Sequence, residues 1–293
     1  MSRQRRRILI TGGSGFVGGH LLSEAKKIWD VFTTYRTESF SFPGVQAYRL
    51  DLEDGNRIRK CVREIRPDTI LHTAAWSDLD ACEKDADRTF RINAEATGIL
   101  AEMCEELGCR FLYTSSDMAF DGKKGDYVES DTVCPINVYG ESKVAGEAFV
   151  RKVCSDHVIA RLALVYGRPV TGSNSFSEWI LGRVRRRERV PLFTDQHRTP
   201  VLVQNVAEAL LELAGSEFVG TIHLGGAEKV DRYTFGLRLA EIRGFSEELL
   251  SPVLMSEVPT VAARPRDVSF NSSKAKKLLK TNLLGYRTGL TYA

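Results

Sequence analysis

The chain has 293 residues, of which 43% are hydrophobic, so it is long and apolar enough to bury a sizeable core. Its 41 basic and 38 acidic side chains leave a formal charge of only +3, which argues against nucleic acid or an acidic membrane as a general partner. Two local basic runs, residues 3–7 and 183–189, are interpreted as a solvated tail and a solvated helix face.

Cysteine usage and the N-terminus bear on the cellular compartment. The six cysteines are scattered without a C-x-x-C pair, and no histidine is spaced to complete a zinc site, so we expect reduced thiols and no bound metal. No apolar run approaches the ~18 residues that a membrane helix needs. The first residues pass from charge directly into a predicted strand, which leaves no room for a signal peptide. These features predict a cytoplasmic protein.

Up to about residue 165, short apolar runs alternate with segments of helical period. Strands are predicted at 7–11, 31–35, 45–50, 69–74, 109–115 and 157–166. Helices are predicted between them at 16–28, 56–65, 89–107 and from 138 onward. Strands that alternate with helices pair in parallel and are covered on both faces. The sequence therefore predicts an α/β fold with a doubly wound parallel sheet over residues 1–165.

Beyond residue 166 the alternation is less regular. Helices are predicted at 175–188, 203–214, 233–244 and 272–280, and a strand at 220–226. No repeat, low-complexity tract or flexible Gly/Ser linker separates this part from the first. We therefore expect residues 166–293 to form a smaller C-terminal lobe packed on the first domain, with part of it returning to the sheet.

A glycine-rich segment, TGGSGFVGG, follows directly after the first predicted strand. Gly12, Gly15 and Gly18 stand at three-residue intervals where the strand must turn into a helix. Glycine lets the backbone turn tightly and approach a pyrophosphate, and the helix that follows offers free N–H groups and a positive dipole end. Any tight strand-to-helix turn also favours glycine, but the position at the N-terminus and the strands that follow favour a dinucleotide-binding loop.

The ends of the second and third predicted strands bear on which dinucleotide binds. Enzymes that read the ribose 2′-hydroxyl usually carry an acidic residue at the end of the second strand, and Arg36 stands there instead. A guanidinium suits a 2′-phosphate, which favours NADP(H). Glu38 lies two residues on and keeps NAD(H) as an alternative. Asp51 is a candidate acceptor for the adenine amino group or, alternatively, a helix cap.

The segment VYGESKVAGE places Tyr139 four residues before Lys143, so both share one face of the helix that an N-cap at Asn137 predicts. A free phenol has a pKa of roughly 10, which a nearby cation lowers. Ser116, just after the strand at 109–115, adds a hydroxyl at the carboxyl edge of the sheet, where ligands bind. A Y-x-x-x-K pair alone is common on exposed helices. With the glycine loop and Ser116 it predicts proton transfer that accompanies a hydride transfer.

The segments TGGSGFVG, SSDMAFDG, YGESKVAGE and ARPRDVSFNSSKAKKLL resemble the extended short-chain dehydrogenases/reductases over nearly the whole chain. Within them the chain is most similar to the dTDP-4-dehydrorhamnose reductase (RmlD-type) group. The resemblance implies an NADP-binding Rossmann domain at residues 1–165 and a substrate-binding lobe at 166–293. It also implies NADPH-dependent reduction of the 4-keto group of a nucleotide-linked 4-keto-6-deoxy sugar.

The resemblance assigns roles where the motifs coincide. It implies that Tyr139 protonates the sugar C4 oxygen, that Lys143 binds the nicotinamide ribose and lowers the pKa of Tyr139, and that Ser116 hydrogen-bonds the same oxygen. Asp117 is implied to contact the sugar. The cofactor-binding set expected from the motifs and the resemblance comprises Gly12, Gly15, Phe16, Val17, Gly18, Arg36, Asp51, Leu52, Ala75, Trp76, Ser77, Asn93, Thr114, Tyr139 and Lys143.

Several positions depart from the group. Met118 follows Asp117 where the related 4,6-dehydratases carry a glutamate, so the second carboxylate that elimination needs is missing. Leu164 stands where rhamnose-pathway reductases usually carry a stacking tryptophan, which leaves the hexose open. Arg198 and Arg264 are candidate substrate-binding residues, with structural salt bridges as the alternative.

Two other functions remain open. One is a different sugar-nucleotide reductase or epimerase. The other follows from one branch of the group, which is similar to the beta subunit of methionine adenosyltransferase and works as a cofactor-binding regulatory subunit. Short-chain reductases often pair through helices, so a homodimer is also left open.

Overall fold

The computed structural model describes residues 5–37 and 39–293, so Arg3 of the N-terminal basic run lies outside the described residues. Its centre is a seven-stranded sheet in the order β11-β6-β5-β4-β1-β2-β3, and every neighbouring pair is parallel. The strands are β1 (Arg7–Thr11), β2 (Asp30–Tyr35), β3 (Gln46–Arg49), β4 (Thr69–His72), β5 (Arg110–Ser116), β6 (His157–Leu162) and β11 (Gly220–Leu224). The predicted α/β fold is confirmed.

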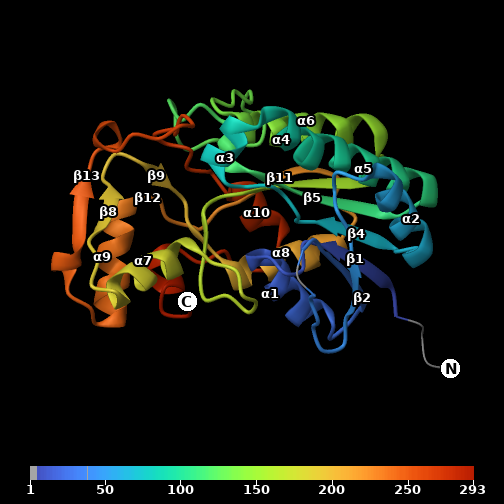
Figure 1. Ribbon diagram of the computed structural model, residues 1–293, viewed down its shortest axis with the longest axis horizontal. Helices are drawn as coiled ribbons and strands as arrows, with labels where there is room; N and C mark the ends of the chain where they lie inside the picture. The colour runs from blue at the N-terminus through green and yellow to red at the C-terminus, as the bar shows by residue number, and fades with distance from the viewer. Residues whose placement is uncertain (1–4, 38) are drawn as a thin grey trace.

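Helices cover both faces of this sheet (Figure 1). One face carries α2 (Gly55–Ile65), α5 (Ala96–Leu107) and α6 (Val138–Val153), and the other carries α1 (Phe16–Ala25), α8 (Val203–Ala214) and α10 (Ser273–Leu278). Along β1, Ile8 and Ile10 belong to the apolar core under α1 and α8, whereas Leu9 belongs to the core under α2 and α5. This alternation is the period of two that a strand imposes, and it explains why the buried strands read as continuous apolar runs.

The C-terminal part adds a lobe with its own apolar core at one end of the sheet (Figure 1). It contains α7 (Phe176–Arg185), α9 (Arg232–Arg243), α11 (Tyr286–Gly289) and the parallel pair β8 (Val190–Phe193) and β13 (Leu250–Val253). Two further short pairs join β7 (Val165–Tyr166) to β10 (Val201–Leu202), and β9 (His197–Arg198) to β12 (Val230–Asp231). Strand β11 and helices α8 and α10 belong to the C-terminal part but pack in or on the main sheet. The chain therefore passes several times between the lobe and the sheet. Within the described residues no helix combines the length and the apolar character that a membrane crossing requires.

The helix predicted at 89–107 is interrupted. The chain forms α3 (Leu79–Lys84), α4 (Ala86–Phe90), a π-helical turn η1 (Arg91–Glu95) and then α5. A π-turn inserts one residue into the helical ladder and often lies at a functional site. Here it turns Asn93 inward, toward the loop that follows β4.

A buried ion pair anchors α6 to the sheet. The Glu147 carboxylate on α6 is fully buried and accepts hydrogen bonds of 2.8 Å from both Nε and Nη2 of Arg161 on β6. Arg151 adds a third bond of 2.7 Å from the solvent side. Burial by itself would raise the pKa of Glu147, but the hydrogen bonds and charge of Arg161, together with Ser115 and Arg151, more than offset it, so the pKa is lowered.

Two matched substitutions test this anchor. Arg161→Met should lower the free energy of unfolding by roughly 3–5 kcal/mol, because it strips a buried carboxylate of its buried partner. Arg151→Met removes the other partner of the same carboxylate, but the Arg151 side chain is 42% exposed against 3% for Arg161, so the loss should stay below about 1 kcal/mol. Urea unfolding followed by circular dichroism measures both. Equal losses would contradict the anchor.

Candidate active site

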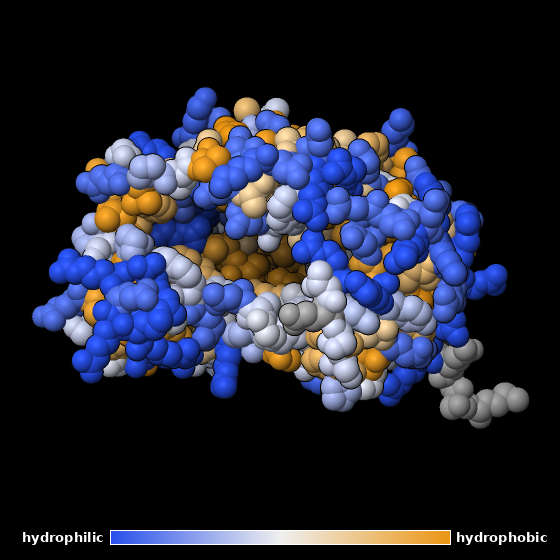
Figure 2. Space-filling view, viewed as in Figure 1, coloured by the Kyte–Doolittle hydropathy of each residue, from blue (hydrophilic) through white to orange (hydrophobic). Residues whose placement is uncertain are grey.

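A cavity of about 650 Å³ lies at the carboxyl ends of the central strands, between the sheet and the lobe. Figure 2 shows it as a hollow with an apolar floor. Strands β2 and β3 lie on one side of β1, whereas β4 and the later strands lie on the other, so the strand order reverses between β1 and β4. Ligands bind at such a switch point in open parallel sheets. Most of the predicted site residues line this cavity: Gly12, Gly15, Phe16, Val17, Gly18, Arg36, Asp51, Leu52, Ala75, Trp76, Ser77, Thr114, Ser116, Asp117, Tyr139 and Lys143.

The glycine loop has the shape that a phosphate site requires. Gly12 has a φ of +74°, and a Cβ added to Gly18 would lie 2.1 Å from the Gly12 carbonyl oxygen, so neither position accepts a larger residue without rearrangement. Helix α1 begins at Phe16, and its N-cap Gly15 makes no side-chain capping bond. The first N–H groups of α1 are therefore left for a ligand, and an anion at this helix end is stabilised by the dipole. The loop fits a dinucleotide pyrophosphate.

The second and third strands bring two predicted residues to the rim. Arg36 directly follows β2 and is exposed at the edge of the cavity. Asp51 accepts a hydrogen bond from the Glu53 N–H at 3.1 Å, while the N-cap of α2 is Asp54. The helix-cap alternative for Asp51 is therefore not the arrangement found. Glu38, the acidic alternative to Arg36, lies outside the described residues.

Asn93 holds the wall of the cavity and does not line it. Its side chain is fully buried, accepts a hydrogen bond from the Trp76 N–H at 2.8 Å and donates to the Trp76 carbonyl at 2.9 Å. It also donates to the Ser142 hydroxyl of α6 at 3.1 Å. The sequence predicted a direct cofactor contact for Asn93. The structure gives it the role of fixing the loop of Trp76 against α6.

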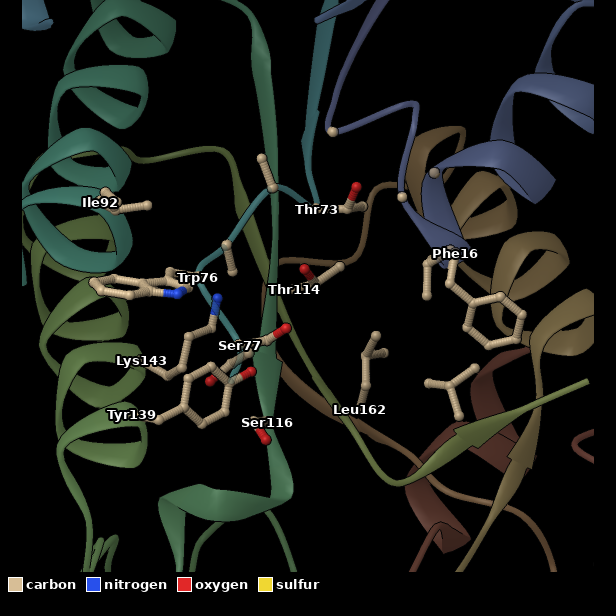
Figure 3. A pocket seen from close by; sticks show the side chains of 18 of the residues that line it. Phe16, Thr73, Trp76, Ser77, Ile92, Thr114, Ser116, Tyr139, Lys143 and Leu162 are labelled. Atoms are coloured by element: carbon tan, nitrogen blue, oxygen red, sulfur yellow. The ribbon is translucent and has the colours of Figure 1, made fainter. Parts of the chain in front are cut away.

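Tyr139 and Lys143 project from one face of α6 into the cavity, near Ser116 and Ser77 (Figure 3). The helix begins as predicted, because Asn137 accepts a hydrogen bond from the Gly140 N–H at 2.8 Å. Both side chains, rather than pointing to solvent, thus face the same space as the glycine loop. This arrangement allows a phenol and an ammonium to act on one ligand.

The electrostatics of this pair differ from the prediction. Burial lowers the pKa of Lys143 to about 7, with the Glu147 carboxylate opposing the shift. The Lys143 ammonium lies 4.3 Å from the centre of the Tyr113 ring, which partly replaces the lost solvation. The sequence predicted that Lys143 lowers the pKa of Tyr139. Instead burial raises the pKa of Tyr139 above its usual range, and the Ser116 hydroxyl opposes this only in part.

Ser116 is the start of a buried polar chain. Its hydroxyl donates to the Asp117 carboxylate at 3.1 Å and accepts a hydrogen bond from the Met118 N–H at 3.1 Å. Burial raises the pKa of Asp117, and the Arg198 guanidinium, whose Nε lies 3.5 Å from Asp117 Oδ2, opposes the rise.

Arg198 and Arg264 stand behind the cavity wall. Arg198 is almost fully buried and donates to the backbone carbonyls of His197 and Pro265. Arg264 pairs with the Asp80 carboxylate at 2.9 Å. Neither is among the residues that line the cavity. The geometry matches the salt-bridge alternative for both.

Several lining residues were not predicted from the sequence as ligand contacts: Ser14, Thr34, Tyr35, Leu50, Thr73, Ala74, Leu79, Ile92, Ser115, Met118, Leu162, Ala163, Leu164, Val165 and Arg232. Thr73 and Leu162 directly follow or end buried strands, so the rule that ligands bind at the carboxyl edge of the sheet would have found them. Arg232 begins α9 in the lobe, and no motif in the sequence marks it.

Comparison with known proteins gives the family. Residues 6–293 match the model of the RmlD substrate binding domain family. The chain belongs to this family. It is 33% identical to the probable low-salt glycan biosynthesis reductase Agl14 of Haloferax volcanii, over 88% of this chain and 87% of that protein.

Two other relatives of this RmlD-family chain have different functions. Methionine adenosyltransferase 2 subunit beta of Mus musculus is 26% identical, over 97% of this chain and 86% of its own. The crystal structure of dTDP-4-dehydrorhamnose reductase from Bacillus anthracis in complex with NADP superposes with a TM-score of 0.88 at 26% identity, covering 98% of each chain. The family and fold predicted from the sequence are confirmed, and the relatives include both a dTDP-4-dehydrorhamnose reductase and a subunit of methionine adenosyltransferase.

The burial of Lys143 predicts a pH dependence of stability. Its pKa in the folded protein is about 7, below the unfolded value, so between pH 7 and about 10 the unfolded chain binds more protons. The wild type should therefore gain stability relative to Lys143→Met as the pH rises from 7 to 9, by up to about 1.4 kcal/mol per pH unit. Urea unfolding of the cofactor-free protein measures it.

The control for this experiment is Lys152→Met, an exposed lysine on the same helix, whose stability should run parallel to that of the wild type. If Lys143→Met also ran parallel to the wild type from pH 7 to 9, Lys143 would not be desolvated as the structure has it.

Proposed function

We propose that the protein is an NADPH-dependent reductase that converts the 4-keto group of a nucleotide-linked 4-keto-6-deoxy sugar to an alcohol. The observation that carries this proposal is the convergence of Tyr139, Lys143 and Ser116 on one cavity beside the glycine loop. The NADP complex of the Bacillus anthracis relative supports the choice of cofactor.

Bound NADPH would supply the hydride. Tyr139 is the proton donor, and its raised pKa suits that task because the phenol keeps its proton at neutral pH until a strong base appears. As the C4 oxygen gains negative charge it becomes an alkoxide, which is a strong enough base to take the proton from Tyr139. A lowered pKa is therefore not needed for the direction of reduction.

Lys143 compensates the charge that Tyr139 acquires. With a pKa of about 7, the amine is populated in both its neutral and its protonated form near neutral pH. A phenolate that develops one helical turn away favours the ammonium and raises the pKa of Lys143. Ser116, whose hydroxyl is oriented by Asp117, would turn toward the C4 oxygen and stabilise its charge.

The residues that line the cavity affect which sugar it can accept. Met118, Leu162 and Leu164 present apolar side chains to the same space as Tyr139. Such a wall suits a 6-methyl group better than a 6-hydroxymethyl group, which would lose hydrogen bonds to water. The 6-deoxy sugar is therefore favoured, and Leu164 in place of an aromatic residue leaves more room around the ring.

Tyr139→Phe should lower the rate of NADPH oxidation by roughly a hundred-fold or more, because general acid catalysis is lost. NADPH affinity should change little, since the ring remains. The rate is followed at the NADPH absorbance band with dTDP-linked 4-keto-6-deoxy sugars, and affinity by NADPH fluorescence. Tyr292→Phe, at an exposed position, is the control and should behave like the wild type.

Near-normal turnover in Tyr139→Phe would remove Tyr139 from the role of acid. A wild type that binds NADPH yet oxidises it with no keto sugar would instead favour the regulatory function of the methionine adenosyltransferase relative.

Arg36→Ala should reduce the preference for NADPH over NADH by roughly ten-fold or more, because a guanidinium paired with a 2′-phosphate makes charge-assisted hydrogen bonds that a hydroxyl cannot replace. The ratio of kcat/KM values for the two cofactors measures the change. Arg57→Ala, an exposed arginine on α2, is the control. An unchanged ratio would take Arg36 out of the 2′-phosphate site.

A further inference from the structure

Three arginines from different segments gather behind and beside Asp117. The charge of Arg198 is matched by Asp117, and that of Arg264 by Asp80. Arg232 has no ion pair with any residue in the described part of the chain. The arginines also repel one another, since Arg198 and Arg264 both lower the pKa of Arg232. The cluster therefore carries one positive charge more than its acidic groups balance.

The Arg232 side chain is fixed in direction, but most of its N–H donors have no partner among the described residues. Its Nε donates to Gln196 Oε1 at 2.9 Å, and its guanidinium lies 4.5 Å from the centre of the Phe176 ring. A guanidinium has five N–H donors. Only the one on Nε is matched, because neither Nη1 nor Nη2 donates to any described residue, and Nη1 is shielded from solvent. Four donors on a fixed fork are left without an acceptor.

This arrangement is costly without a ligand. Burial, and then repulsion by Arg198, lower the pKa of Arg232 to about 9. The side chain is half-buried, and a guanidinium that is partly removed from water without a facing anion is destabilising. Gln196 and Phe176 fix its direction, and Arg232 lines the same cavity as Asp117 and Leu164.

We propose that Arg232 binds an anionic oxygen of the substrate at the lobe side of the cavity. This inference rests on the proposed function, in which the cavity takes a nucleotide sugar. Two parts of such a ligand carry anionic oxygens that fit a guanidinium fork: the diphosphate and a carboxylate on the sugar ring. Of these three arginines, only Arg232 lines the cavity, and it has no ion pair among the described residues.

Ligand binding tests the proposal without turnover. UDP, dTDP, UDP-glucose and UDP-glucuronate are titrated calorimetrically into wild type and Arg232→Gln, with and without saturating NADP⁺. A diphosphate contact predicts that Arg232→Gln weakens all four ligands by roughly ten-fold or more, the loss of a charge-assisted hydrogen bond. A carboxylate contact predicts a loss of that size for UDP-glucuronate alone. Either pattern supports an anion contact at Arg232, and the second would also replace the 6-deoxy sugar of the proposed function with a sugar acid.

Two further variants separate binding from folding. Arg232→Lys keeps the charge and should recover part of the lost affinity. Arg238→Gln makes the same change on the same helix at an arginine already paired with Glu241, and should bind like the wild type. NADP⁺ affinity and the urea midpoint should be unchanged in Arg232→Lys.

The proposal is overturned if Arg232→Gln and Arg232→Lys bind all four ligands as tightly as the wild type, or if the wild type binds none of them. The proposed reductase activity fails by a different result, the absence of NADPH oxidation. Because the titrations need no reaction, the two failures are distinguishable.

Discussion

The burial of Lys143 and the partial burial of Tyr139 on one face of α6 are the constraint on which the rest of the structure depends. An amine and a phenol on one helix face would be ordinary surface groups if they were solvated. Burial brings the pKa of the amine down to about 7 and raises that of the phenol. The proton then stays on Tyr139 until a stronger base is present, and Lys143 is ready to take up charge when it leaves.

The surroundings of this pair hold it in place through contacts that never reach the cavity. Glu147 lies one turn beyond Lys143 and locks α6 to β6 through Arg161. Asn93 ties the neighbouring loop of Trp76 to α6 through Ser142 and the Trp76 backbone. A relaxed α6 would admit water and return both pKa values toward those of free side chains. The supporting ion pair and the buried amide are thus part of the chemistry even though they touch no ligand.

The sequence predicts best what is encoded locally. The spacing of Gly12, Gly15 and Gly18 and the four-residue step from Tyr139 to Lys143 describe geometry within a single turn or helix, and the fold confirms that these segments meet at the carboxyl edge of the sheet. The boundary near residue 165 stays a prediction, as do the homodimer and the cytoplasmic location.

The features that the sequence does not reveal depend on tertiary contacts. The predicted direction of the Tyr139 pKa shift was wrong because burial, which raises this pKa, does not appear in residue spacing, and the Ser116 hydroxyl opposes it only in part. Arg198 stood out in its motif, yet its guanidinium is consumed by Asp117 and backbone carbonyls. Arg232 carried no motif, yet it lines the cavity without an ion pair to any described residue. Whether a charged group serves a ligand or the fold depends on partners that lie far away along the chain.

The most direct test of the central claim is to follow the hydrogen itself. NADPH labelled with deuterium at nicotinamide C4 is mixed with the protein and a dTDP-linked 4-keto-6-deoxy sugar, and the product is analysed by mass spectrometry and NMR. The account predicts one deuterium on the former carbonyl carbon, from one face of the nicotinamide, with the hydroxyl proton drawn from solvent through Tyr139. A product without deuterium at that carbon, or NADPH that binds and is never oxidised, would contradict it.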